Sequence, residues 1–143
     1  MNFFYQLKSK LIKGIIALCL GFLLILSPFG LTSEAASISM SGDFVKDTVS
    51  VAQSLKETIA TPEEEQESDQ YRQDAIDLIT SYISRYRNRP TVNGTTSFTT
   101  MQTALNAMAG HYKTFANRPI PEKLKDRLNK ELSRAEKIVV KEI

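Results

Sequence analysis

Side chains able to do acid–base or nucleophilic chemistry are scarce in this sequence of 143 residues. His111 is the only histidine and Cys19 is the only cysteine. A serine–histidine–acid triad needs a histidine as its base, and the sequence has neither a GxSxG turn nor a glycine-rich loop followed by a lysine. We therefore expect His111 to be a hydrogen-bonding residue at the edge of the fold, and we expect the protein not to be an enzyme.

Metal chemistry is not indicated either. Ferritin-like sites use Glu-x-x-His pairs on facing helices, and the sequence contains none. The acidic residues between Glu63 and Asp69 lack the glycine and the spacing of a calcium loop. Negative charge at the start of a helix, where the helix dipole stabilises it, explains this cluster better than weak calcium binding. The sequence predicts neither a metal nor a cofactor.

Two stretches instead contain residue types that protein interfaces use. Residues 82–87 interleave tyrosine with arginine, which are enriched at interface hot spots, and the candidates are Tyr82, Arg85, Tyr86 and Arg87. The alternative is that the tyrosines are buried and the arginines solvate a helix end. A second stretch has short polar side chains that suit either hydrogen bonding to a partner's loops or a plain solvated face: Thr99, Thr100, Gln102, Thr103 and Asn106.

The N-terminal segment has the pattern of an export signal. Lysines at 8, 10 and 13 precede an uncharged run over 14–26, and small residues flank Glu34. We predict a signal peptide over 1–35. The alternative is a retained membrane anchor, but a spanning helix needs about 20 apolar residues and this run is shorter. Because Leu18 precedes Cys19 where lipidation requires a small residue, we interpret this cysteine as an apolar residue of the leader.

Apolar residues recur at helical spacing through the rest of the chain. The first helix is predicted near 43–60, and the second begins at Thr61, which would cap it, and ends near Arg87. The third helix would be capped by Ser97 and carry an apolar stripe as far as Phe115. The fourth opens at Pro121 and buries five apolar residues: Leu124, Leu128, Leu132, Ala135 and Ile138.

Short links between four amphipathic helices predict an all-α fold, an up-down-up-down four-helix bundle over 43–143. Residues 36–42 read as a flexible tail. Between the third and fourth helices, Pro119 and Pro121 fix the backbone path, because each proline restricts its own φ and its predecessor's conformation. We interpret both prolines as setting a corner between antiparallel neighbours, with Arg118 shared between the corner and a partner.

Charge is separated along the chain. Without residues 1–35 the protein has 15 basic and 15 acidic side chains. This balance disfavours a nucleic-acid partner, which usually requires a basic face. Residues 43–77 contain ten acids and three bases, whereas 78–143 contain five acids and twelve bases. The separation is either an ordinary solvated surface or a dipole that orients the molecule during docking.

Three blocks in order carry a family resemblance: residues 82–87 (YISRYR), 97–106 (SFTTMQTALN) and 118–124 (RPIPEKL). They resemble the lumenal photosystem II assembly and repair factors, subunit 27 of the Psb series, over nearly all of the chain after the leader. The resemblance implies a four-helix bundle in the thylakoid lumen of a cyanobacterium or plastid. It also implies peripheral binding to immature or damaged photosystem II, at the large lumenal loop of the 43-kDa core antenna protein.

The same resemblance implies a role in assembling the manganese cluster and in delaying the docking of extrinsic oxygen-evolution subunits. Family members commonly carry a lipid-modified cysteine at the mature start, and Ala36 stands there in this sequence. An unanchored form, or a paralogue with a different partner, is therefore expected. We expect a monomer. Two alternatives remain open: a permanent extrinsic subunit of photosystem II, and an exported helical carrier of a small molecule.

Overall fold

The structure is a computed structural model that describes residues 39–66, 68–116 and 118–142. These residues form five α-helices and no strand: α2 (Phe44–Ala60), α3 (Glu63–Gln66), α4 (Asp69–Tyr86), α5 (Thr96–Thr114) and α6 (Glu122–Glu142). The predicted all-α class is confirmed. The predicted leader and Cys19 lie outside the described residues.

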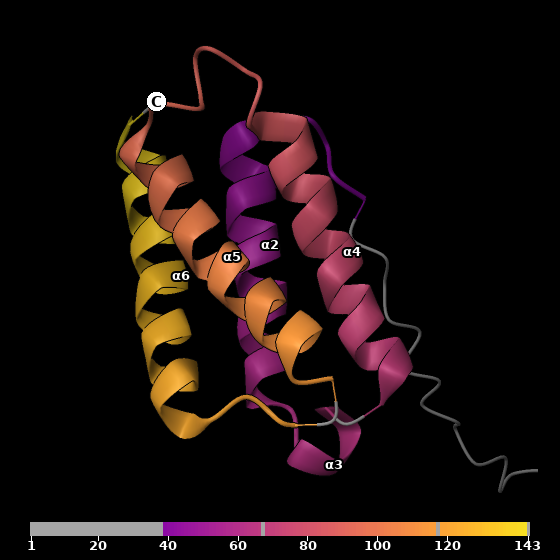
Figure 1. Cartoon of the computed structure of the whole chain (residues 1–143). Coiled ribbons are helices and arrows are strands. Elements are labelled where there is room, and N and C mark those ends of the chain that lie inside the picture. The colour runs from indigo at the N-terminus through magenta and orange to yellow at the C-terminus, as the bar shows by residue number, and fades with distance from the viewer. Residues whose placement is uncertain (1–38, 67, 117, 143) are drawn as a thin grey trace, which may run out of the picture. The chain divides into compact units, whose positions relative to one another are not determined.

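The four long helices lie side by side, and consecutive ones run in opposite directions (Figure 1). Both α2 and α5 pack against α4 and against α6. The helices α4 and α6 therefore occupy opposite corners. The core lies between all four helices and contains aliphatic and aromatic side chains with no exposed surface, among them Val51, Leu55, Tyr82, Tyr86, Met101, Leu105 and Leu128.

The first predicted helix is α2. Asp43 caps it by accepting a hydrogen bond from the Lys46 amide at 3.1 Å. Five residues predicted at helical spacing are buried in α2: Phe44, Thr48, Val51, Leu55 and Ile59. Asp47 is buried on the same face, 3 % exposed, although a carboxylate was not expected there.

The prediction of one helix from Thr61 to Arg87 is wrong, because two helices replace it. The Thr61 hydroxyl does not cap a following helix; it donates to the Glu57 carbonyl at 3.0 Å and ends α2. Ser68 caps α4 instead. The short α3 stands between them because the Gln66 side chain turns inward, where it is 1 % exposed and donates to the Thr61 carbonyl at 2.5 Å.

The cap predicted for the third helix is also wrong. Thr95, not Ser97, accepts from the Phe98 amide at 3.2 Å and begins α5. Ser97 is buried, and its amide and hydroxyl both donate to the Glu142 carboxylate at the end of α6, as does the Thr96 amide at 2.9 Å. A carboxylate from one helix thus satisfies the free amides at the start of its neighbour.

The segment with Pro119 and Pro121 leads from α5 into α6. The Pro121 carbonyl accepts from the amides of Leu124 and Lys125, which starts α6. Ile120 between the two prolines is 0 % exposed, and its amide donates to the Gln66 side chain at 3.4 Å. Phe115, predicted to belong to the apolar stripe of the third helix, is instead 45 % exposed at the end of α5.

In α6 the buried face is slightly rotated from the prediction. Leu128, Leu132 and Ala135 are buried as expected, but Val139 takes the next core position, and Leu124 and Ile138 are only half-buried. The opposite face of α6 is strongly polar. None of the described helices combines the length and the apolar composition needed to cross a bilayer.

Replacing Glu142 by glutamine should destabilise the fold by about 1 kcal/mol, because the carboxylate acts as a cap for α5. Urea unfolding monitored by circular dichroism measures the change. The matched control is Glu57→Gln, since Glu57 is exposed on α2 and its change should stay within about 0.5 kcal/mol. Equal stabilities of the two variants would show that the contact does not stabilise α5.

Candidate partner-binding site

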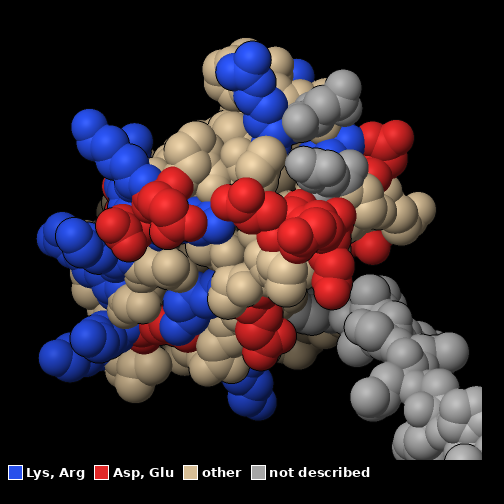
Figure 2. All heavy atoms as spheres, turned by 90° about the horizontal axis from the view of Figure 1, so that it is seen from below, with Lys and Arg blue, Asp and Glu red and all other residues tan. Residues whose placement is uncertain are grey.

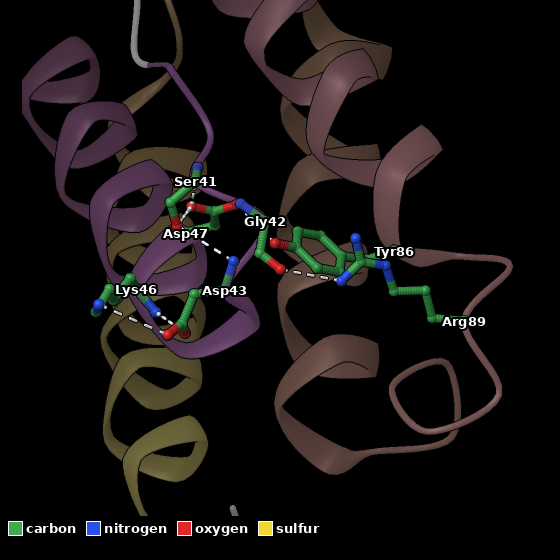
Figure 3. A network of polar contacts seen from close by, with 7 residues as sticks. All are labelled: Ser41, Gly42, Asp43, Lys46, Asp47, Tyr86 and Arg89. Atoms are coloured by element: carbon green, nitrogen blue, oxygen red, sulfur yellow. Dashed lines mark hydrogen bonds and ion pairs between the residues drawn. The ribbon is translucent and has the colours of Figure 1, made fainter.

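A buried carboxylate organises the end of the fold where α4 leads into α5 (Figure 3). The Asp47 carboxylate accepts from the Ser41 amide at 2.8 Å and from the Ser41 hydroxyl at 2.7 Å. It also accepts from the Gly42 amide at 3.0 Å and from the Tyr86 hydroxyl at 2.6 Å. The predicted flexible tail is therefore wrong for residues 41 and 42, which Asp47 holds against α2 and α4.

Four donors around one carboxylate affect its ionisation. Burial alone would raise the pKa of Asp47. The hydrogen bonds from Tyr86, Ser41 and Gly42 favour the charged form more strongly, so the pKa lies below its ordinary value of 3.8. For Tyr86, burial and the nearby Asp47 carboxylate both raise the pKa of the hydroxyl, which keeps it a donor.

Arg89 closes this network from the link after α4. Its guanidinium lies 4.7 Å from the centre of the Tyr86 ring and donates to the Gly42 carbonyl at 3.1 Å. Gly42 has a φ of +89°, which residues with a side chain rarely adopt, so glycine is required at this turn. The segment before α2 and the link after α4 are consequently tied to each other.

The tyrosines of the 82–87 stretch do not form a surface. Tyr82 and Tyr86 are both 0 % exposed, and their rings lie 5.1 Å apart. The Tyr82 hydroxyl bonds to the Thr48 hydroxyl at 2.6 Å. Their prediction as direct partner contacts is therefore corrected: they are core residues, because their hydroxyls find partners on α2. The alternative reading of this stretch, with buried tyrosines and solvating arginines, is confirmed.

The arginines of this stretch are exposed. Arg85 lies beside the segment before α2, and together with Ser81, Ser84, Ser39 and Met40 it lines a shallow surface hollow. Arg87 is the last residue of the helical turn that ends α4.

Three of the predicted polar residues of α5 share one exposed face: Thr99, Thr103 and Asn106. Thr100 and Gln102 flank this face and are half-buried. The Thr103 hydroxyl donates to the Thr99 carbonyl at 2.9 Å, and the Thr99 hydroxyl donates within its own helix. Their oxygens remain free to accept. The face extends to Gly110, where an added methyl group would meet no atom within 4 Å, so packing inside the chain does not require a glycine there.

Arg118 belongs to the corner between α5 and α6. Figure 1 shows this corner at the opposite end of the helices from the link between α4 and α5. The Arg118 side chain is exposed, 5.8 Å from the centre of the Phe115 ring. The Arg118 carbonyl lies 3.2 Å from Nε2 of His111, which is 8 % exposed. The hydrogen-bonding role predicted for His111 is confirmed. The structure thus separates Arg118 from Arg85 and Arg87 and from the start of α5.

Sequence reasoning missed Asp47, Gln66 and Arg89. Asp47 carried a signal, because it stands three residues after Phe44 and four before Val51, on the spacing of the buried face. A charged residue at such a position needs buried donors. Gln66 has no comparable signal, since its partners are backbone groups that only the folded chain brings near. Arg89 stands three residues after Tyr86, whose ring it covers, but its bond to the Gly42 carbonyl depends on the fold.

Comparison with known proteins defines the class of this helical chain. The sequence model of the family described as "Photosystem II Pbs27" matches residues 11–139. The chain belongs to this family.

Relatives and a solved structure agree with this membership. The chain is 40 % identical over 117 residues to the "Photosystem II lipoprotein Psb27" of Synechocystis sp., covering 82 % of this chain and 87 % of that protein. It is 40 % identical over 97 residues to the "Photosystem II assembly factor lipoprotein Psb27" of Thermosynechococcus vestitus, covering 68 % and 72 %. The solution structure of Psb27 from cyanobacterial photosystem II matches with a TM-score of 0.66 and 41 % identity over 73 % of this chain and 91 % of that one.

Replacing Asp47 by asparagine should destabilise the protein by about 2 kcal/mol. The new amide group would face donors, and the charged hydrogen bonds would be lost. Asp43→Asn is the matched control four residues away, because asparagine caps a helix as well as aspartate does. Chemical unfolding of both variants gives the comparison. A destabilisation at 43 as large as that at 47 would contradict the role assigned to the buried carboxylate.

The same carboxylate predicts an acid dependence. The folded-state pKa of Asp47 is lowered. The stabilisation that this carboxylate provides is therefore fully present above pH 3.8 and is lost as the pH falls through the folded-state pKa. The free energy of unfolding should therefore fall more steeply on acidification in the original protein than in Asp47→Asn. Unfolding curves recorded from neutral pH to below pH 3.8 test this. Parallel pH profiles would mean that Asp47 has the same pKa in both states.

Proposed function

We propose that this protein is a non-catalytic assembly and repair factor of photosystem II. The observation that carries the proposal is the family match over 11–139, supported by a relative named as a photosystem II assembly factor. In this proposal the described helices form an up-down-up-down four-helix bundle, exported by a signal peptide over 1–35. The bundle acts as a monomer, without a cofactor, peripheral to the lumenal face of the thylakoid membrane.

The partner in this proposal is immature photosystem II, bound transiently at the large lumenal loop of the 43-kDa core antenna protein. Binding there would aid assembly of the manganese cluster and delay docking of the extrinsic oxygen-evolution subunits. The exposed face of α5 suits such a loop. The hydroxyl oxygens of Thr99 and Thr103 can accept from backbone amides, and Asn106 can both donate and accept.

A glycine on the outer face of α5 supports the choice of this helix, over the others, as the docking face. Gly110, about one turn before the end of α5, costs up to about 1 kcal/mol relative to alanine, and no neighbouring atom in the described chain lies within 4 Å of where a Cβ would stand. A partner's backbone that approaches α5 closely would provide the reason for a glycine. Arg87 at the end of α4 and Arg118 at the far corner would then engage carboxylates at the periphery of the interface.

The interior of the bundle does not suit a small-molecule carrier. The α5 side chains that face the core, such as Met101, Leu105 and Met108, are at most 1 % exposed because side chains of the other helices cover them. A permanent photosystem II subunit would use the same outer surface as a transient factor. The two differ in abundance, since a permanent subunit would be present at about one copy per oxygen-evolving complex.

Arginine substitutions on the α5 face test the proposal. Thr103→Arg/Asn106→Arg should reduce co-purification with detergent-solubilised immature photosystem II at least about tenfold, because bulky charge at an interface centre prevents close contact. The matched control is Ser50→Arg/Gln53→Arg, which adds the same charge to exposed positions of α2. Quantitative mass spectrometry of the retained complexes measures binding and the copy number in oxygen-evolving complexes.

Retention of the α5 variant at the level of the α2 control would remove this face from the interface. A wild-type protein that binds no photosystem II complex at all would overturn the function itself. Near-unit copy number in oxygen-evolving complexes would favour the permanent subunit.

A further inference from the structure

The outer face of α6 has a continuous row of six cationic side chains that the assignments above do not use. They recur at steps of four and three residues, which keeps them on one line along the helix, and all are exposed: Lys123, Arg127, Lys130, Arg134, Lys137 and Lys141. At about 1.5 Å per residue the row is about 27 Å long. The buried residues Leu128, Leu132 and Val139 lie on the opposite side of the helix, so the row points directly away from the core. We call it the α6 cationic row.

The α6 cationic row is only partly compensated, because three of the five acids of α6 are engaged elsewhere and the other two, Asp126 and Glu131, lie beside the row. Glu136 pairs with Lys56 of α2 at 2.5 Å, and Glu142 caps α5. Glu122 pairs with Lys125, outside the row. Only Arg127 of the row has an ion pair among the described residues, with Glu131 at 3.0 Å.

Negative charge is concentrated elsewhere on the described chain. Figure 2, seen from the α3 end, shows acidic side chains across the middle of this face. Basic side chains project at the left, where Figure 1 places α6. The acids of α4, such as Asp74 and Asp77, lie away from the α6 corner, since α4 and α6 are at opposite corners. The acidic α3 meets only the start of α6, where Glu63 pairs with Lys125 at 3.7 Å. An anionic surface would therefore attract α6 and repel the α4 side.

We propose that the α6 cationic row holds the protein on the anionic headgroups of a lipid bilayer. Six side chains on one straight line reach a plane together. Four of the six are lysines, which protein interfaces deplete at their centres. The row contains no aromatic or aliphatic anchor of the kind that hot spots require. An anionic membrane surface instead attracts lysine-rich segments electrostatically, and this attraction does not require side chains to insert into the bilayer.

A shallow hollow within the row fits this assignment. Lys130, Arg134 and Lys137 line it together with Asn129, Ser133, Ile138 and one carboxylate, Asp126, so cations outnumber anions three to one. The amide and the hydroxyl add neutral donors to three cations, a combination that suits the oxygens of a phosphate or sulfonate headgroup. The attachment goes beyond the docking function, because it uses another helix and another class of partner.

Vesicle co-sedimentation tests the assignment with the full chain. The vesicles are phosphatidylcholine alone or with added phosphatidylglycerol, at low salt. The wild-type protein should bind only the anionic vesicles with an affinity that falls as salt rises. Lys130→Gln/Lys137→Gln should weaken that binding roughly 25-fold, from about fivefold per cation. The matched control, Lys46→Gln/Lys113→Gln, removes the same charge from exposed positions of α2 and α5, and should change binding only a few-fold.

Circular dichroism confirms folding of each variant. Residues 1–38 are identical in all of them, so differences between variants report on the described part. Equal losses in the two double variants would show that net charge, not the α6 cationic row, drives binding, and would overturn the proposal. It would also be overturned if Lys130→Gln/Lys137→Gln left vesicle binding intact but weakened binding to detergent-solubilised photosystem II, because the row would then belong to the protein partner. Failure of the α5 variants to affect docking leaves the vesicle result unchanged, so the two proposals fail separately.

Discussion

Two tyrosine hydroxyls buried in α4 constrain the whole arrangement, because each must find a polar partner inside the fold. Tyr82 bonds to Thr48 and Tyr86 to Asp47, so residues one turn apart on α4 meet adjacent residues on α2. Sliding α4 by one turn would break both bonds at once. A buried polar group left without a partner costs about 1–3 kcal/mol. The pair therefore fixes the register of two helices, which apolar packing alone specifies weakly.

The same contacts decide which groups remain for a partner. Asp47 is fully engaged with Ser41, Gly42 and Tyr86, and Glu142 is engaged with the start of α5. Both carboxylates lie where consecutive chain segments meet, so they close the fold and are not available for recognition. Besides the acidic α3 and α4 side, the outside presents two surfaces of different character: an uncharged polar face on α5 and a cationic face on α6. Neither contributes to the core, so each can change without loss of the fold.

Periodicity predicted the four long helices because burial follows spacing directly, as Leu128 and Leu132 show. It failed where a side chain competes with the backbone. Thr61 was expected to begin a helix, but its hydroxyl bonds backward to α2, and Ser97 was expected to cap but binds Glu142, forty-five residues away. Partners so distant in sequence leave no local pattern. For the candidate site, composition identified Tyr82 as an interface residue, and only the fold showed that its hydroxyl is used inside.

Geometry connects the two surfaces. Because α5 packs between α4 and α6, its outer face points roughly at a right angle to the outward direction of α6. If the α6 cationic row lies flat on a bilayer, the face containing Thr103 and Asn106 points sideways, along the membrane plane. A docking face held in that direction meets a protein that rises from the membrane beside it, and the search for that partner is confined to two dimensions. Weak electrostatic attachment then raises the rate of encounter without adding contacts to the interface.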